Sequence, residues 1–179
     1  MSLKPYSTLT DYITGKEVPN VGAEENRQHL ERFLVEERGY TRKDIAVDVD
    51  IEMTIDNAVY RSQVDLVVSC DGGQTAIMVV KCCAGSPASR EREAISAARL
   101  LMDYQIPLAV VSDAQMAIVM DTVSGKKIGD GLDEIPSKDE ARNKMQSWEP
   151  QPLSPQRREK ELLIFRTYDI DNVNVRRKL

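Results

Sequence analysis

Several residue types are scarce in this chain of 179 residues, and each scarcity argues against certain classes of function. With one Trp and two Phe, aliphatic side chains must fill the core. The single histidine, His29, lies on a predicted helix, whereas a zinc site needs several nitrogen or sulfur ligands and a hydrolase nucleophile needs a nearby base. No glycine-rich loop opens a helix in the manner of nucleotide-binding folds. These absences argue against zinc enzymes, serine or cysteine hydrolases and nucleotide-binding proteins.

The three cysteines and the short apolar runs also limit where the protein acts. Cys82 and Cys83 are adjacent in a predicted strand, so their side chains point to opposite faces, and Cys70 lies at a turn. This pattern does not predict a disulfide framework. No apolar run has the length of a signal peptide core or of a membrane span. We therefore expect a soluble protein of the reducing cytoplasm, with no membrane partner.

The net charge of −5 argues against strong binding of nucleic acid through overall electrostatics. It does not exclude a local basic patch around one predicted hairpin. The candidate nucleic-acid contacts in this patch are Lys81, Arg90, Arg92 and Arg99. The alternative for the arginines is the solvated face of a helix.

Composition divides the chain into four parts. Residues 1–20 contain two prolines and a glycine and are predicted to form an N-terminal arm. Residues 21–147 carry the periodic apolar pattern of one α/β domain. A proline-rich linker follows over 148–156, and the segment 157–179 contains an apolar stretch that must dock on the core or on a neighbouring subunit. A homo-oligomer therefore stays open.

Within the central domain, helices and strands alternate. Apolar spacing predicts a helix over 23–38 and a strand over 45–55. A strand, a helix that extends to about residue 104 and a second strand follow over 76–111, and such a crossover makes its two strands parallel. A further hairpin is predicted around Ser124, and a capped helix begins near Ser137. The order indicates a mixed sheet flanked by helices.

One hairpin brings polar residues together. Two runs rich in Val and Ile flank the turn Asp71-Gly72-Gly73, which is typical of an antiparallel hairpin with a short loop. If Gly72 is at the centre, Asp65 lies opposite Val79, and Gln63 lies opposite Lys81. Because side chains on one face recur every second residue, all four lie on the same face of the sheet.

A carboxylate beside a lysine on adjacent strands is half of a magnesium-dependent site that cleaves phosphodiesters. The carboxylate binds the metal, and the lysine orients or deprotonates the attacking water. Val79 stands where a second carboxylate would be most useful, and a valine cannot bind a cation. The alternative is a cross-strand ion pair between Asp65 and Lys81, which would add little stability if it were exposed.

The order of predicted elements resembles the core of the PD-(D/E)xK nucleases: helix, strand, strand with an aspartate, strand ending in a lysine, helix, strand. In detail it resembles the N-terminal nuclease domain of type I restriction enzyme R subunits, over roughly residues 15–136. The stretches that carry the likeness are Glu24-Glu25-Asn26-Arg27, Gly39-Tyr40, Val64-Asp65-Leu66-Val67-Val68 and Ile106-Pro107-Leu108-Ala109-Val110-Val111-Ser112-Asp113. The resemblance implies a restriction-endonuclease-like α/β fold with an αβββαβ core.

The resemblance also implies a site. Asp65 and Lys81 would be members of the active site, and Gln63 would assist through its side-chain carbonyl. The first helix often supplies a carboxylate in this family, so Mg²⁺ would bind Asp65 together with Glu24 or Glu25. DNA would be the substrate.

Two residues depart from the family pattern. Val64 stands where a proline is common, and Val79 replaces the acidic ligand. The helicase-type motor segments of full R subunits are absent from these 179 residues. Two functions therefore remain: a metal-dependent DNA endonuclease with a degenerate active site, or an inactive domain of the same fold that binds DNA, RNA or a protein partner.

Overall fold

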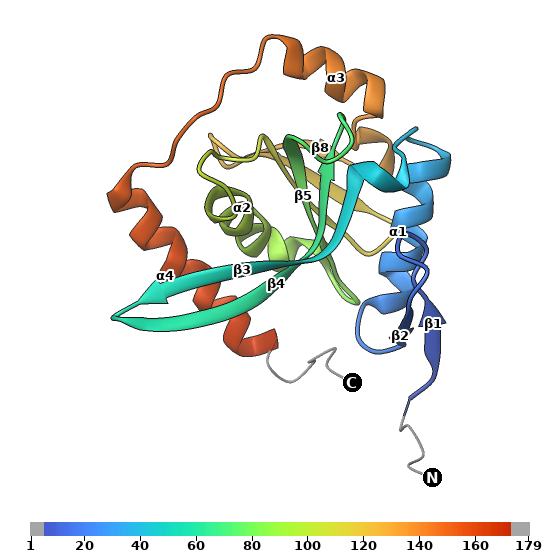
Figure 1. Ribbon diagram of the computed structural model, residues 1–179, viewed down its shortest axis with the longest axis horizontal. Helices are drawn as coiled ribbons and strands as arrows, with labels where there is room; N and C mark the ends of the chain where they lie inside the picture. Colours follow the sequence, from blue (N-terminus) through green and yellow to red (C-terminus); the bar gives the residue numbers. More distant parts are fainter. Residues whose placement is uncertain (1–5, 173–179) are drawn as a thin grey trace.

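The computed structural model describes residues 6–172 and the side chains of residues 6–168. Its centre is a mixed six-stranded sheet with helices on both faces (Figure 1). The strands lie in chain order, and only β5 and β6 are parallel. They are β3 (Ile45–Ile55), β4 (Ala58–Ser69), β5 (Ala76–Cys82), β6 (Leu108–Ser112), β7 (Ala117–Asp121) and β8 (Lys126–Asp130). The parallel pair confirms the predicted crossover.

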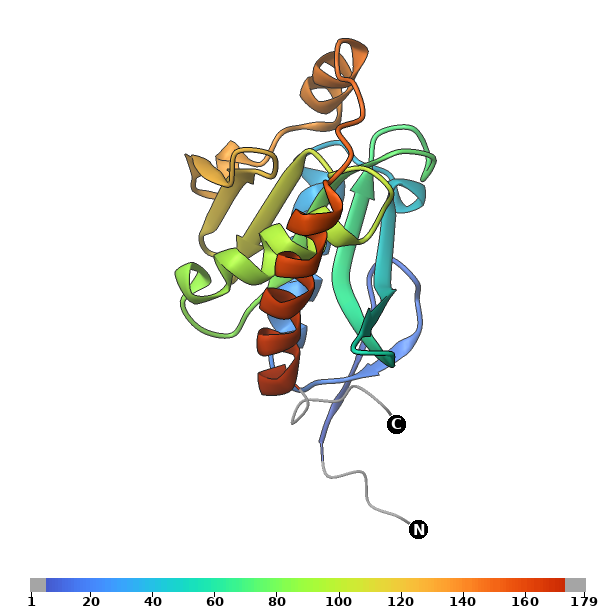
Figure 2. The same ribbon diagram turned by 90° about the vertical axis from the view of Figure 1, so that its left-hand side faces the viewer.

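The helices divide between the two faces of the sheet. Helix α1 (Glu24–Glu36) covers one face, and α2 (Glu91–Leu100) and α4 (Pro155–Asn172) cover the other (Figure 2). Helix α3 (Lys138–Gln146) lies at one end of the sheet. The remaining elements are β1 (Thr8–Thr10), β2 (Glu17–Pro19), η1 (Arg42–Asp44), η2 (Pro87–Arg90) and η3 (Leu132–Glu134). No helix within residues 6–172 is long and apolar enough to cross a membrane.

Two hydrophobic layers hold these helices to the sheet. Val67 and Val79 point into the layer beneath α2, and Leu66 and Val80 point into the layer beneath α1. The second half of β4 and most of β5 are therefore buried on both faces, which explains their continuous apolar runs. A charged side chain on either strand consequently lies among buried neighbours.

Helix α2 follows the predicted inward pattern but is shorter than predicted. Ala94, Ala97 and Ala98 are buried, and their small side chains allow the helix to lie close to the sheet. The helix ends at Leu100 instead of continuing to Tyr104. Tyr104 turns back to the sheet, where its hydroxyl donates to the carbonyl of Ala76 and accepts from its N–H. Tertiary contacts at this end replace another helical turn.

The register of the β4–β5 hairpin differs from the predicted one. Val67 pairs with Val79, whereas the sequence predicts Asp65 at that place. When this register is continued, Asp65 lies across from Lys81. The prediction that Gln63 faces Lys81 is therefore wrong by two residues.

The cause is a longer loop. Residues 70–75 connect the strands, instead of three residues, and the pairing is irregular between Val68 and Ser69. The carboxylate of Asp71 accepts hydrogen bonds at 3.0 Å from two backbone N–H groups that precede β5. Because the displacement is an even number of residues, every side chain keeps its predicted face.

The N-terminal segment folds onto α1. Strands β1 and β2 pair with each other, and the backbone N–H of Tyr12 donates to the side chain of Gln28 at 2.6 Å. Arg27 is fully buried beneath this hairpin and lies 3.1 Å from a carboxylate oxygen of Asp11. Glu31, one helical turn further along α1, lies 3.6 Å from the same guanidinium. One buried cation thus joins the arm to the helix.

Glu31 makes this cluster sensitive to pH. Burial, followed by repulsion from Asp11, raises the pKa of Glu31 to about 7, although attraction to Arg27 opposes the shift. A carboxyl whose pKa is higher in the folded state stabilises the fold when it is protonated, below its unfolded pKa. This stabilisation is lost as the pH rises through the folded pKa.

We predict that Glu31→Gln, which cannot ionise, stabilises the protein more at about pH 8 than at about pH 5, by on the order of 2 kcal/mol. Urea unfolding of the variant and the parent at both pH values measures the difference. Glu37→Gln is the matched control, because Glu37 is exposed on the same segment. Equal pH dependence of the parent and Glu31→Gln would contradict the prediction.

Candidate active site

A small cavity of about 10 Å³ lies between β4, β5, α2 and α4. Its apolar wall includes Val79 of β5 and Phe165 of α4. Its polar lining consists of Gln63, Asp65, Lys81 and Glu93. The hairpin thus brings three sequence-predicted site residues to one cavity, and α2 adds a fourth polar group that was not predicted.

Asp65 and Lys81 meet across the two central strands. The distance from Asp65 Oδ2 to Lys81 Nζ is 3.4 Å. The same carboxylate oxygen accepts a hydrogen bond from the backbone N–H of Cys82 at 2.8 Å. The Asp65 side chain is 5 % exposed and that of Lys81 is 18 % exposed. Asp65 is therefore buried and Lys81 is partly buried, which differs from the exposed ion pair considered as an alternative. Backbone and lysine together fix the orientation of the carboxylate.

Glu93 approaches the same lysine from the other side. Its Oε1 lies 3.3 Å from Lys81 Nζ, and its Oε2 lies 3.2 Å from a guanidinium nitrogen of Arg90. Glu93 belongs to the first turn of α2, and its side chain is 5 % exposed. The Lys81 ammonium is therefore in contact with two buried carboxylates, one from a strand and one from a helix.

Glu93 was not among the predicted site residues, because the start of this helix was interpreted only through its arginines, as nucleic-acid contacts or as a solvated face. One signal was available. The crossover after β5 must return α2 over a face of the sheet, so the first turn of α2 lies near the end of the strand that carries Lys81. A carboxylate in that turn can reach the lysine. Its position on the helix, however, follows from the loop conformation over residues 83–90, which periodicity does not predict.

The two carboxylates suit a magnesium ion in donor type. Mg²⁺ prefers oxygen ligands and commonly binds one or two carboxylates while keeping several waters. Asp65 and Glu93 supply two carboxylates within 3.4 Å of one ammonium nitrogen. Among residues 6–172, no group of three or more His, Cys, Asp or Glu side chains has the geometry of a metal site. The site would therefore need water to complete the coordination.

The predicted metal set of Asp65 with Glu24 or Glu25 is not assembled. Glu24 is fully buried and lies 2.5 Å from the guanidinium of Arg27, in the cluster that joins the arm to α1. Glu25 accepts a hydrogen bond from Asn20 at 3.1 Å. Their acidic residue type suits a metal, but buried Arg27 and the neighbouring arm provide partners that the sequence pattern did not reveal.

Gln63 lines the cavity from β4, one strand position before the buried half. Its side-chain N–H group donates to Asp50 of β3 at 3.1 Å. That hydrogen bond directs the amide nitrogen toward β3. Gln63 therefore lies at the edge of the Asp65–Lys81 pair, not between its members.

The predicted basic patch divides into separate environments. Arg92 is exposed, and Arg90 is partly exposed beside Glu93. Arg99 is 4 % exposed and lies 2.6 Å from the carboxylate of Glu161 on α4, so its assignment as a surface contact for nucleic acid is wrong in this structure. The sequence pattern could not show that α4 covers it.

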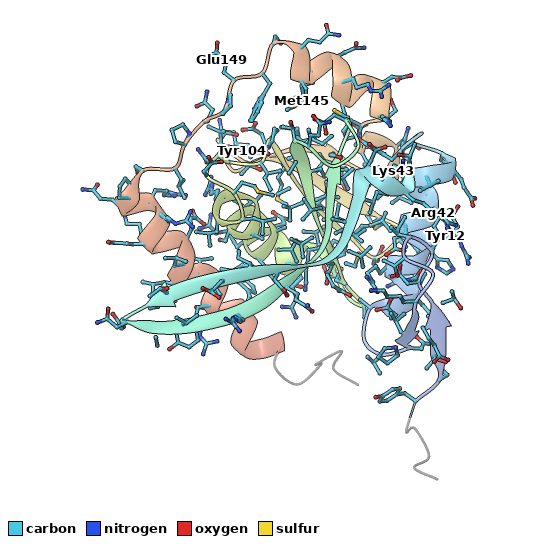
Figure 3. The ribbon with its side chains drawn as sticks, viewed as in Figure 1. Tyr12, Arg42, Lys43, Tyr104, Met145 and Glu149 are labelled. Atoms are coloured by element: carbon cyan, nitrogen blue, oxygen red, sulfur yellow. The ribbon has the colours of Figure 1, made fainter. Side chains whose placement is uncertain are left out.

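A second group of basic residues lies beside α1. Figure 3 shows Arg42 beside Tyr12, and the Arg42 guanidinium lies 4.8 Å from the centre of the Tyr12 ring; Lys43 follows Arg42 in the chain. This group is next to the helix that covers the opposite face of the sheet from α2. It does not extend the cavity around Asp65.

Comparisons with known proteins agree with the fold. The family model for the N terminus of type I restriction enzyme R protein matches residues 22–136, a range that contains Asp65, Lys81 and Glu93. A search of curated proteins found no match.

One solved structure has a similar fold: a fragment assigned as an HsdR subunit of a type I restriction enzyme from Vibrio vulnificus YJ016. Its TM-score is 0.55 at 13 % sequence identity, and the match covers 70 % of this chain and 25 % of that one. The matched part of this chain thus spans about a quarter of the length of that solved chain. The mixed sheet and flanking helices confirm the predicted fold class. Since the family model covers more than half of the chain, this protein belongs to the family of type I restriction enzyme R protein N-terminal domains.

Proposed function

We propose that this domain is a metal-dependent nuclease that cleaves phosphodiester bonds in DNA. The observation that carries the proposal is the Lys81 ammonium, which lies 3.4 Å from Asp65 and 3.3 Å from Glu93 inside a cavity. Carboxylates and a lysine are the groups that such chemistry needs. Membership of the R protein N-terminal family supports DNA as the substrate.

Glu93 supplies the carboxylate that Val79 cannot. Val79 lines the cavity from β5, and Glu93 reaches the same cavity from α2. Asp65 and Glu93 would hold Mg²⁺ through carboxylate oxygens. When bound, the metal would stabilise negative charge on the phosphate and lower the pKa of a coordinated water.

The remaining groups position these side chains. The Cys82 N–H holds one oxygen of Asp65, and Arg90 holds one oxygen of Glu93. Both carboxylates are thereby oriented before any ligand binds, which lowers the cost of organising the site. Lys81 can donate a proton in a hydrogen bond to a phosphate oxygen or to the attacking water, because its ammonium lies between the two carboxylates.

Binding of DNA would depend on few cations. Exposed Arg92 and partly exposed Arg90 are near the first turn of α2, next to Glu93. Because the protein carries a net charge of −5, its affinity for DNA should rest on these local contacts. Its dependence on salt should be shallow, since the slope scales with the number of phosphate contacts.

A second candidate function is an inactive domain of the same fold that binds nucleic acid or a protein partner. The observation that favours it is Val79, which leaves β5 without the acidic ligand of the family pattern. In that case Asp65, Lys81 and Glu93 form a buried ion network, and Arg90 and Arg92 serve binding alone. The experiments below separate the two functions.

We predict that the purified protein cleaves DNA with Mg²⁺ or Mn²⁺, and that Asp65→Ala and Lys81→Ala each reduce the rate by about 100-fold or more, since each removes a group needed for metal or water. A cleavage assay on single- and double-stranded DNA measures the rates. Glu52→Ala is the matched control, because Glu52 is an exposed carboxylate on the neighbouring strand and its partner Arg61 does not line the cavity. Absence of cleavage with either metal would favour the inactive domain.

A second prediction concerns Glu93. Glu93→Gln should lower the affinity for Mn²⁺ by about 10-fold or more and reduce cleavage in parallel, because an amide is a weaker ligand than a carboxylate. Isothermal titration calorimetry with Mn²⁺ measures affinity without relying on activity. The double variant Val79→Glu/Glu93→Gln should recover both, since it moves the carboxylate from the helix to the strand.

Glu91→Gln is the control for this experiment. Glu91 lies in the same helical turn but does not line the cavity. If Glu93→Gln binds Mn²⁺ as tightly as the parent, Glu93 is not a ligand, and the proposed set of Asp65 with Glu93 is refuted.

A further inference from the structure

Helix α4 forms one wall of the cavity that contains Asp65, Lys81 and Glu93. Phe165 of α4 forms part of the cavity wall and is 3 % exposed. The side chains of Asp65 and Glu93 are each 5 % exposed. Ligand pockets usually have volumes of about 300 to 1,000 Å³, whereas the space in this cavity that a water-sized molecule can occupy is about 10 Å³. A nucleotide therefore does not fit while α4 is in place.

The position of α4 is that of a cover. Figures 1 and 2 show it lying along α2 and across the long β3–β4 ribbon. Apart from Phe165, its contact with the ribbon includes Arg166, whose guanidinium lies 3.9 Å from the centre of the Tyr60 ring. Helix α4 takes no part in the hydrogen bonding of the sheet, because the six strands pair with one another.

The attachment of α4 to α2 is centred on one buried carboxylate. Glu161 accepts hydrogen bonds from Ser96 at 2.7 Å and from Arg99 at 2.6 Å, both on α2. Burial acts to raise the pKa of Glu161, but the hydrogen bonds from Ser96 and Arg99 outweigh it and hold that pKa below its ordinary value. Glu161 is thus charged at neutral pH, and both it and Arg99 would regain water if α4 moved away.

The connection to the rest of the chain lacks regular structure, and it contacts the core through the carbonyl of Gln151, which accepts a hydrogen bond from the Gln105 N–H at 2.9 Å. Residues 147–154 join α3 to α4 without helix or strand and contain Pro150 and Pro152. Figure 1 shows this segment running around the outside of the molecule. The family match ends at residue 136, so the cover lies outside the part of the chain that defines the family. The helix can leave α2 without breaking a strand pairing.

We propose that α4 is an autoinhibitory cover, and that it must move off α2 before a phosphodiester can reach Asp65, Lys81 and Glu93. This inference rests on the proposed nuclease function. In the step that controls access to this site, the Glu161 carboxylate separates from Ser96 and Arg99, and Phe165 withdraws from the cavity.

The test uses a cysteine inside the cavity as a probe of opening. Ala97 lines the cavity from α2 and is 4 % exposed, so Ala97→Cys in the full chain reports access to the site. The rate of its modification by a small thiol reagent is measured by peptide mass spectrometry. This readout separates it from Cys70, Cys82 and Cys83, which are all buried.

In the Ala97→Cys background, Glu161→Ala should raise the modification rate at least about tenfold, because it removes the contacts of Glu161 with Ser96 and Arg99. Glu161 does not line the cavity, so the substitution does not change the cavity wall directly. Phe165→Ala should also raise the rate, and it keeps the test decisive if Glu161→Ala fails to fold. Glu159→Ala and Leu163→Ala are the matched controls on the exposed side of α4 and should leave the rate unchanged. Circular dichroism checks that each variant is folded.

Unchanged modification in both folded variants would overturn the cover. Cleavage of DNA is measured on the same variants without the probe cysteine, and Glu161→Ala should cleave faster than Glu159→Ala. If Glu161→Ala and Phe165→Ala are modified faster but neither they nor the parent cleaves DNA, α4 acts as a cover but the protein is not a nuclease. Cleavage by the parent with unchanged modification in Glu161→Ala and Phe165→Ala would retain the nuclease and reject the cover.

Discussion

The burial of β4 and β5 on both faces is the constraint on which the rest of the structure depends. A charge on such a strand is costly unless partners lie within reach. Asp65 and Lys81 satisfy this requirement for each other, and the Cys82 N–H and Glu93 complete their surroundings. The same arrangement that makes these charges tolerable inside the protein also makes them a candidate active site. The contacts that compensate the buried charges are therefore the same contacts that would orient them in an active site.

Two carboxylates contact Lys81, one from a strand and one from a helix. The family pattern expects an acidic residue on β5, where this chain has Val79. Glu93 lies on α2 and still contacts Lys81, because the right-handed crossover returns the helix over the face that carries the lysine. Val79 then serves the hydrophobic layer beneath α2. In the proposed nuclease, the helix would provide the ligand and the strand would provide packing.

The two faces of the sheet carry two kinds of buried polar cluster. Under α1, Arg27 gathers Asp11, Glu24 and Glu31 and joins the N-terminal hairpin to the domain. Between α2 and α4, Arg99 and Glu161 join the C-terminal helix. Each cluster attaches a terminal segment through charges that are hydrogen-bonded in place, so both segments are held by specific contacts as well as by apolar packing. Only the second of these segments lines the cavity.

Local periodicity in the sequence determined the α/β fold, the crossover and the face shared by Asp65 and Lys81, because a period of two residues survives an error of two in the register. It could not determine the register itself, since the loop over residues 70–75 depends on hydrogen bonds that the Asp71 carboxylate accepts from backbone N–H groups. Tertiary structure alone decided that Glu24 pairs with Arg27, that Glu93 contacts Lys81, and that α4 buries Arg99 and forms one wall of the cavity. These are contacts between elements distant in the chain or joined by irregular loops, and their geometry is fixed only when the elements pack.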